Sequence, residues 1–139
     1  MSRVAEPFAT RHTMALQAPA KCRILIVEDD PDSCEALARM LRRKGHEIEC
    51  ASSVGKALVK LEEWSPECVL LDLMLPDASG ALVLRKIRAE RLPIKVAVIT
   101  AAGKNSPTLK VALSYDPDIV FEKPLNHLDL LRWLDHAVP

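Results

Sequence analysis

The sequence predicts a single α/β domain in which a parallel β-sheet lies between two layers of helices. Five short runs rich in apolar and β-branched residues alternate with five segments of helical apolar spacing across residues 22–137. This alternation is typical of a parallel sheet with helices on both faces. No internal repeat or low-complexity tract interrupts it, and 139 residues suffice for one domain with a substantial core.

The third predicted strand, residues 68–71, organises the rest of the sequence. Four apolar residues run directly into Asp72, and Pro76 closes the segment. A continuous apolar run of this length is typical of a strand buried on both faces. Asp72 would then lie at the carboxyl edge of the sheet, where open α/β folds keep their sites. Alone, an aspartate in this place is equally well explained as a turn former or a helix cap.

The first half of the chain predicts two strands and two helices. Residues 23–27 form the first strand, and a helix capped by Asp30 begins at Pro31 and ends at Gly45. Its predicted apolar face consists of Cys34, Leu37, Ala38 and Leu41. Residues 46–51 form the second strand, with Ile48 and Cys50 alternating against two glutamates. Ser53 caps the next helix, whose predicted apolar face consists of Val54, Ala57, Leu58 and Leu61.

The second half continues the alternation after the turn at residues 76–80. A third helix covers residues 81–90, and a fourth strand covers residues 95–100. Ser106 caps a short fourth helix that ends at Ser114, and residues 118–122 form the fifth strand. Asn126 caps the last helix, whose predicted apolar face consists of Leu128, Leu131 and Leu134.

Charge and composition exclude several classes of protein. Lysine plus arginine and aspartate plus glutamate number 19 each, so the net charge gives no electrostatic case for nucleic acid or an anionic membrane. No apolar run approaches the length of a membrane span. Residues 1–21 show no sustained period and no apolar signal region, so we expect a flexible extension before a domain at residues 22–139. A cytoplasmic location is the default expectation.

The four cysteines are Cys22, Cys34, Cys50 and Cys68. They form no CxxC pair, and no cysteine–histidine cluster has the spacing of a zinc site. Each cysteine lies in or beside an apolar element, so small buried hydrophobic residues are the favoured interpretation, over the alternative of a metal or redox role.

The ends of the other strands change the interpretation of Asp72. The first strand ends in Glu28 and Asp29, the fourth in Thr100, and the fifth is followed by Lys123. In a parallel sheet these ends share one edge, so three carboxylates, a hydroxyl and an ammonium would converge. Carboxylates gathered there would repel unless a cation joined them, and Mg²⁺ suits a site with few protein ligands. Each residue has an ordinary explanation alone, but together they favour a functional site.

Four segments together resemble the receiver domain of two-component response regulators. They are residues 24–31, residues 69–76 with Gly80, residues 98–101 and residues 121–125. The resemblance covers about residues 22–137 in the order and spacing of the family. It implies a flavodoxin-like, doubly wound, three-layer fold with strand order 2-1-3-4-5.

The resemblance implies a role for each residue of this edge. Asp72 matches the phosphoacceptor, which takes a phosphoryl group from a phosphohistidine, Thr100 matches the switch hydroxyl, and Lys123 matches the lysine that pairs with the phosphoryl group. Asp29 matches a direct Mg²⁺ ligand, together with Asp72 and the backbone carbonyl of Met74. Glu28 matches the second acidic position, which reaches the metal through water. Mn²⁺ is an expected substitute for Mg²⁺.

These roles imply a phosphorylated switch rather than an enzyme. The implied partners are a sensor histidine kinase or a histidine phosphotransfer protein, and an output partner that the sequence does not identify. The face formed by the fourth helix, the fifth strand and the last helix is a candidate homodimer surface. One rival class is a Mg²⁺-dependent phosphotransfer enzyme, which is disfavoured because no second acid lies two residues after Asp72. Another is a degenerate receiver that only binds a partner. A stand-alone receiver and the receiver part of a longer regulator are equally compatible with the sequence.

Two features depart from the pattern of the family, and two further positions bear on the lifetime of the phosphorylated state. Val120 occupies the place of the usual switch aromatic, and Phe121 should point to the opposite face of the strand. Residues 114–118 replace the usual small turn, so the fourth helix should be short or irregular. Neither Met74 nor Ala102 can orient a water molecule well, so we expect a comparatively long-lived phosphorylated state.

Overall fold

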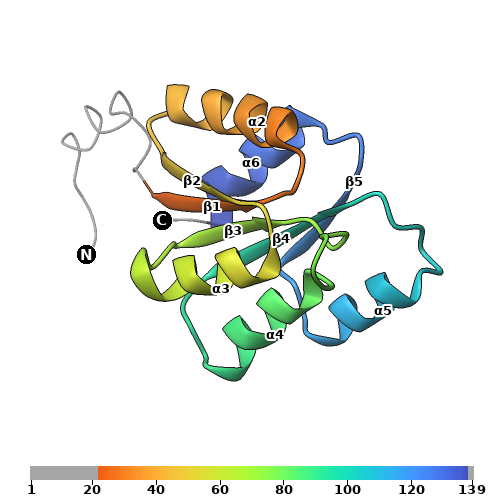
Figure 1. The fold of residues 1–139 in the computed structure, drawn as a ribbon. Helices are drawn as coiled ribbons and strands as arrows, with labels where there is room; N and C mark the ends of the chain where they lie inside the picture. The colour runs from red at the N-terminus through yellow and green to blue at the C-terminus, as the bar shows by residue number, and fades with distance from the viewer. Residues whose placement is uncertain (1–21, 138–139) are drawn as a thin grey trace, which may run out of the picture.

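The computed structural model describes residues 22–137, which form a parallel sheet between two layers of helices (Figure 1). The strands are β1 (Arg23–Val27), β2 (Glu47–Ala51), β3 (Cys68–Leu71), β4 (Lys95–Thr100) and β5 (Ile119–Glu122). The helices are α2 (Pro31–Arg43), α3 (Val54–Glu63), α4 (Ala81–Ala89), α5 (Pro107–Ser114) and α6 (His127–Ala137). The strand order is β2-β1-β3-β4-β5, as the resemblance implied. The extension predicted for residues 1–21 lies outside the described residues.

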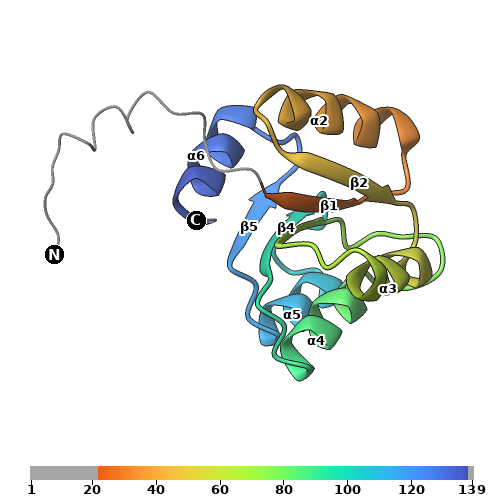
Figure 2. The ribbon, with the colours of Figure 1, turned by 90° about the vertical axis from the view of Figure 1, so that its left-hand side faces the viewer.

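The two helical layers cover opposite faces of the sheet. Helices α2 and α6 lie on one face, and α3, α4 and α5 lie on the other (Figures 1 and 2). Successive side chains of β1 therefore enter different cores, because strand side chains alternate between faces. Leu25 and Val27 belong to the core beneath α3, α4 and α5, whereas Ile24 and Ile26 belong to the core beneath α2 and α6. This double burial explains why the strands are continuously apolar in sequence.

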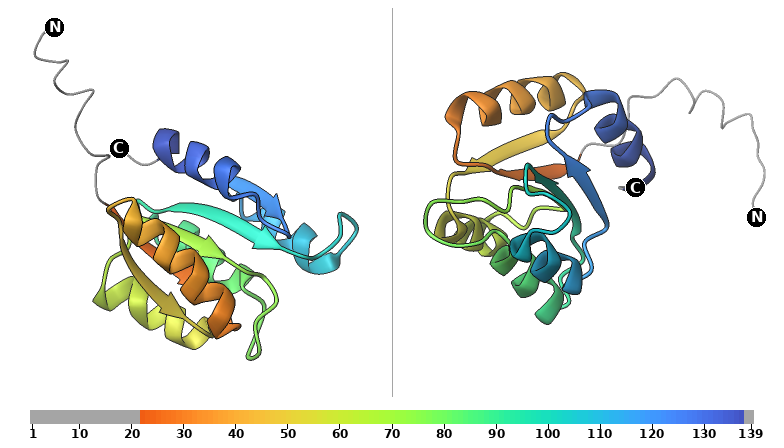
Figure 3. Two further views of the ribbon diagram at one scale, coloured as in Figure 1. Left: turned by 90° about the horizontal axis from the view of Figure 1, so that it is seen from above. Right: turned by 90° about the vertical axis from the view of Figure 1, so that its right-hand side faces the viewer.

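The register of the sheet brings the candidate residues to one edge. Val27 lies opposite Leu71, Leu71 lies opposite Val98, and Thr100 lies opposite Glu122. All five strands run in parallel, so their carboxyl ends meet at the same side, as the view from above shows (Figure 3).

Four helix starts confirm the predicted caps. The side chain of Asp30 accepts a hydrogen bond from the backbone of Asp32, and Ser53, Ser106 and Asn126 accept bonds from residues three positions further on. Such caps satisfy backbone donors that have no partner within the helix. They are predictable because donor and acceptor lie within one turn of each other.

The predicted apolar face of α6 is partly wrong. Leu134 is buried as expected, but Leu128 is 63% exposed and Leu130 is fully buried in its place. Two residues along a helix are about 200° apart, so Leu128 and Leu130 lie on nearly opposite sides of α6. Leu131 packs against the core as predicted, so only Leu128 was assigned to the wrong side. The position of α6 against the sheet decides which side is buried. On α2, Leu37 is only half-buried.

Two of the four cysteines also differ from the prediction: Cys34 is buried as expected but is bonded to a second cysteine, and Cys50 is exposed. Cys34 of α2 and Cys50 of β2 form a disulfide, with Cα atoms 6.6 Å apart. Cys50 is exposed, whereas Ile48 and Ala51 are the buried residues of this edge strand. Sequence spacing could not reveal this pair, since the packing of α2 beside β2 brings the two residues together. Cys22 and Cys68 are buried free thiols, as predicted.

Within residues 22–137, no helix combines the length and the apolar character that a membrane crossing requires.

Candidate functional site

Asp72 lies at the end of β3, where the backbone and one lysine fix its carboxylate. The residue is only 6% exposed. Its backbone N–H donates to the carbonyl of Val27 at 3.0 Å, which ties the end of β3 to the end of β1. Its Oδ1 accepts from the N–H of Met74 at 3.0 Å, and its Oδ2 accepts from Lys123 Nζ at 2.8 Å. The carboxylate is therefore partly desolvated and held in place.

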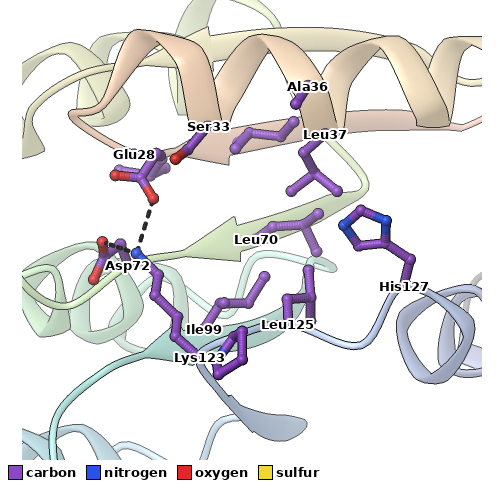
Figure 4. A pocket seen from close by; sticks show the side chains of 13 residues that line it. Glu28, Ser33, Ala36, Leu37, Leu70, Asp72, Ile99, Lys123, Leu125 and His127 are labelled. Atoms are coloured by element: carbon purple, nitrogen blue, oxygen red, sulfur yellow. Dashed lines mark hydrogen bonds and ion pairs between the residues drawn. The ribbon is translucent and has the colours of Figure 1, made fainter.

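Lys123 follows β5 and joins two of the predicted acids (Figure 4). Its Nζ lies 2.8 Å from Asp72 Oδ2 and 3.0 Å from Glu28 Oε1. Its backbone N–H donates to the carbonyl of Thr100 at 2.9 Å, so β4 and β5 fix the base of the side chain. Burial lowers the pKa of Lys123, but the hydrogen bonds and charges of Asp72 and Glu28 outweigh it and raise the pKa above its ordinary value.

Three carboxylates meet beside the ammonium group. Glu28, Asp29 and Asp72 each offer one oxygen, and these oxygens lie within 4.8 Å of one another. The other oxygen of Glu28 accepts from the N–H of Asp30 at 3.1 Å, which holds this acid against the start of α2. A cluster of hard oxygen donors on two neighbouring strands fits a small divalent cation such as Mg²⁺. The predicted juxtaposition of the acids is thus present.

Thr100 is the last residue of β4, and Met74 lies in the loop that follows Asp72. Thr100 is fully buried, and its hydroxyl oxygen accepts from the N–H of Ala102 at 3.0 Å. The backbone of Met74 contacts Asp72, while its side chain is 59% exposed. The structure therefore places the backbone of Met74 beside the carboxylate of Asp72.

Gly80 approaches the site from the far end of the β3–α4 loop. Its N–H donates to the carbonyl of Leu73 at 2.9 Å. A Cβ at this position would overlap the carbonyl oxygen of Asp72 and come within 3.0 Å of Leu73 Cα. Glycine is needed here because of this close approach and not because of its backbone conformation. Its φ of −59° is open to any residue.

A pocket beside Asp72 was not predicted from the sequence. It has a volume of about 380 Å³ and lies between α2, the sheet and the β5–α6 connection (Figure 4). Glu28, Asp72 and Lys123 line one part of it, and the remaining wall is largely apolar, including Leu37 and Ile99. These residues come from separate elements, so no local sequence pattern marks the pocket.

The contact of Asp77 with the start of α3 was also not predicted from the sequence. Its carboxylate accepts from the backbone N–H groups of Val54 and Gly55, both at 3.0 Å, at the start of α3. These backbone bonds hold the pKa of Asp77 below its ordinary value. The β3–α4 loop that follows Asp72 is thereby tied to a neighbouring helix.

The two residues at the switch position lie as predicted. Val120 packs against the core beneath α3, α4 and α5. Phe121 points to the opposite side, where its ring meets Trp133 edge-on with centroids 6.4 Å apart. Phe121 therefore cannot replace an aromatic side chain at position 120.

The strand order defines a doubly wound α/β domain, and three acids and a lysine form a charged cluster at its carboxyl edge. Comparison with known proteins identifies the family. The family model of the response regulator receiver domain matches residues 24–135. The chain therefore belongs to the response regulator receiver domain family.

Individual relatives agree with this assignment. The DNA-binding response regulator MtrA of Mycolicibacterium smegmatis is 34% identical over 110 residues, which are 78% of this chain and 47% of MtrA. The chain thus spans about half the length of such curated relatives.

Solved structures show the same fold. A CheY-like receiver domain protein of Methanospirillum hungatei has a TM-score of 0.78 at 30% identity, over 85% of this chain and 94% of that one. The response regulator TrrA of Thermotoga maritima, solved with Mg²⁺ and a beryllium fluoride group, has a TM-score of 0.72 at 27% identity, over 84% and 99% of the two chains.

Proposed function

We propose that a carboxylate oxygen of Asp72 accepts a phosphoryl group from a phosphohistidine. The observation that carries this proposal is the buried carboxylate of Asp72, held by Lys123 and flanked by Glu28 and Asp29. In the transfer, an oxygen–phosphorus bond forms at Asp72 while the nitrogen–phosphorus bond of the donor breaks. The imidazole nitrogen keeps the electron pair of that bond. Carboxylates act as covalent nucleophiles when they are held in line with the bond that breaks.

Charge neutralisation is the main task of the surrounding residues. The phosphoryl group carries negative charge toward a site that already holds three carboxylates. Lys123 can neutralise one phosphoryl oxygen, and the N–H of Ala102 is a further donor near the end of β4. The lysine also offsets the repulsion between Asp72 and Glu28 before the donor arrives.

Glu28, Asp29 and Asp72, with the backbone carbonyl of Met74, would hold Mg²⁺, and Mn²⁺ could replace it. The fit rests on the three carboxylate oxygens gathered within 4.8 Å and on the backbone of Met74 beside Asp72. When bound, the metal supplies positive charge for the oxygens of the transferring group. The similar regulator TrrA was solved with Mg²⁺.

Thr100 would report the phosphorylated state. Its hydroxyl oxygen accepts from the N–H of Ala102 in the unphosphorylated protein. A hydroxyl can instead turn to donate to a phosphoryl oxygen, because phosphorylation adds strong acceptor oxygens. The core position of Val120 leaves no aromatic side chain to follow that movement. The switch should therefore act mainly through the β4–α5 loop.

The proposed donor is a sensor histidine kinase or a histidine phosphotransfer protein, and the site is proposed to work in the cytoplasm. The pocket beside Asp72 offers an apolar wall against which a donor could pack.

An unidentified output partner or a second copy would bind the face formed by α5, β5 and α6. On α5, Val111 and Leu113 are 48% and 50% exposed. The net charge of zero gives this domain no basis for binding nucleic acid or a membrane.

The domain would act as a stoichiometric switch rather than as an enzyme. Asp72 is followed by Leu73 and Met74, so no acid lies two residues on to assist a leaving group in repeated turnover.

Phosphorylation by acetyl phosphate in the presence of Mg²⁺ tests this function. We expect wild-type protein to gain one phosphoryl group per chain, as measured by intact mass under mild conditions. Asp72→Asn should gain none. Asp116→Asn is the matched control, because Asp116 is exposed and its backbone φ of 59° suits asparagine.

Two results would count against the proposal. One is equal phosphorylation of wild type and Asp72→Asn. The other is release of inorganic phosphate over many turnovers without a phosphorylated protein, which would indicate a hydrolytic enzyme.

A further inference from the structure

We propose that Cys34 and Cys50 form a reversible redox switch that controls the acidic cluster of Glu28, Asp29 and Asp72. The disulfide joins the first turn of α2 to the edge strand β2. The first turn of α2 follows the acids directly along the chain. The inference rests on the proposed role of these acids as a Mg²⁺ site.

The disulfide is connected to the acidic loop at both of its ends, through Cys34 itself and through the residue after Cys50. On one side, the N–H of Cys34 donates to the carbonyl of Asp30 at 3.0 Å. On the other side, Cys50 immediately precedes Ala51, whose carbonyl accepts the N–H of Glu28 at 3.0 Å. The S–S bond therefore closes a ring that contains residues 28–30. Opening it removes a covalent brace from the segment that carries two of the three acids.

The Glu28–Asp30 segment also depends on the first turn of α2 for its hydrogen bonds. Asp30 Oδ2 accepts from Ser33 Oγ at 2.6 Å, and Glu28 Oε2 accepts from the N–H of Asp30 at 3.1 Å. A shift of the first turn would therefore move the carboxylate of Glu28. Groups that orient metal ligands in this way affect metal affinity even though they do not touch the metal.

Exposure makes this cysteine pair accessible to small thiols. Cys34 is 4% exposed, whereas Cys50 is an exposed residue of an edge strand. A thiolate such as that of glutathione would attack Cys50 Sγ, form a mixed disulfide and release Cys34 as a thiolate, which takes a proton. A second thiol then reduces the mixed disulfide. In sum, two thiols give up two electrons and two protons to the protein, and they leave as their own disulfide.

The other two cysteines of the described segment lack the properties of a switch. Cys22 and Cys68 are 2% and 0% exposed. Burial raises the pKa of Cys22 to about 11, and burial also raises the pKa of Cys68. Thiolates are the reactive form, so these two thiols should stay reduced while the pair at Cys34 and Cys50 responds. In a reducing cytoplasm a structural disulfide is uncommon, which favours a transient, regulatory bond.

Thiol counting and Mg²⁺ titration together test the switch. After treatment with oxidised glutathione, mass spectrometry of alkylated, unfolded protein should find two free thiols, at Cys22 and Cys68. Dithiothreitol should raise the number to four, in line with the four cysteines of the chain. Calorimetric titration with Mg²⁺ alone should give an affinity about three- to tenfold weaker in the reduced protein. Amide hydrogen exchange of residues 28–34 should be faster in that form.

Cys50→Ser is the decisive variant, because Cys50 is exposed and the change should not disturb the core. It should match reduced wild type in Mg²⁺ affinity and should not respond to dithiothreitol. Four free thiols after oxidation would overturn the proposal, and so would equal Mg²⁺ affinity and equal hydrogen exchange in the two redox forms. Thiol counts and hydrogen exchange need neither metal nor phosphoryl donor. A failure of the switch is therefore distinguishable from a failure of phosphorylation at Asp72.

Discussion

Asp72 is surrounded by groups that either hold its carboxylate or limit the space around its backbone. Lys123 and the N–H of Met74 hold the two oxygens, while Gly80 contacts the peptide of Asp72. Hydrogen bonds thus hold the carboxylate oxygens of Asp72. The backbone of Asp72 lies so close to Gly80 that no side chain fits at position 80. Small changes at either place should alter the direction in which the carboxylate points.

Gly80→Ala should move the backbone of Asp72. The added Cβ would overlap the carbonyl oxygen of Asp72, so the β3–α4 loop must shift. We expect a loss of unfolding free energy of about 1–3 kcal/mol, measured by urea denaturation, and slower phosphorylation by acetyl phosphate. Gly103→Ala is the control, because a Cβ there meets nothing within 4 Å. Equal stability and an equal rate in Gly80→Ala and wild type would show that Asp72 tolerates the shift.

Residues at strand ends were predictable, whereas contacts across the fold were not. Glu28, Asp29 and Asp72 were predicted together because parallel strands end at one edge. The disulfide and the contact of Asp77 with α3 were not predicted, since each joins residues that are distant in sequence. The long-lived phosphorylated state expected from Met74 and Ala102 stays a prediction.

The elements around the site are linked by contacts that extend beyond the sheet. The β3–α4 loop, which follows Asp72, reaches the start of α3 through Asp77. The backbone N–H groups of Val54 and Gly55, which donate to Asp77, have no acceptors inside the helix. The loop and the helix should therefore respond together when either of them is changed.

Asp77→Ala should loosen this link in a way that depends on pH. The folded-state pKa of Asp77 is below its ordinary value of 3.8, so the ionised form contributes stability above that value. The contribution is lost as the pH falls through the folded-state pKa. We therefore expect the variant to have a lower Tm than wild type near neutral pH, by calorimetry. The difference should shrink below pH 3.8, and a difference that grows on acidification would contradict the role of the carboxylate.

At the level of elements, the starts of helices were more predictable than their orientation. The caps at Asp30, Ser53, Ser106 and Asn126 depend on contacts within one turn. The buried side of α6 depends on how the helix packs against β5, so Leu128 was assigned to the wrong side. The edge position of β2 likewise left Cys50 exposed.

The whole molecule is organised by the order of its strands. Placing β1 and β3 side by side brings Glu28 and Asp29 to Asp72. Placing β5 beyond β4 lets Lys123 reach both Glu28 and Asp72. The alternation of apolar runs predicted the parallel sheet, because continuous apolar strands require helices on both faces. The strand order itself came from the resemblance to receiver domains, since periodicity does not determine which strands are neighbours.

The most direct test of the account asks which residue carries the phosphoryl group. Protein phosphorylated with acetyl phosphate and Mg²⁺ can be treated with borohydride, which reduces an aspartyl phosphate to homoserine. Peptide mass spectrometry then locates the reduced residue. We predict homoserine at position 72 in oxidised and reduced protein alike, with unmodified Asp29 and Glu28. Homoserine at another aspartate, or none in fully phosphorylated protein, would contradict the central claim that Asp72 is the acceptor.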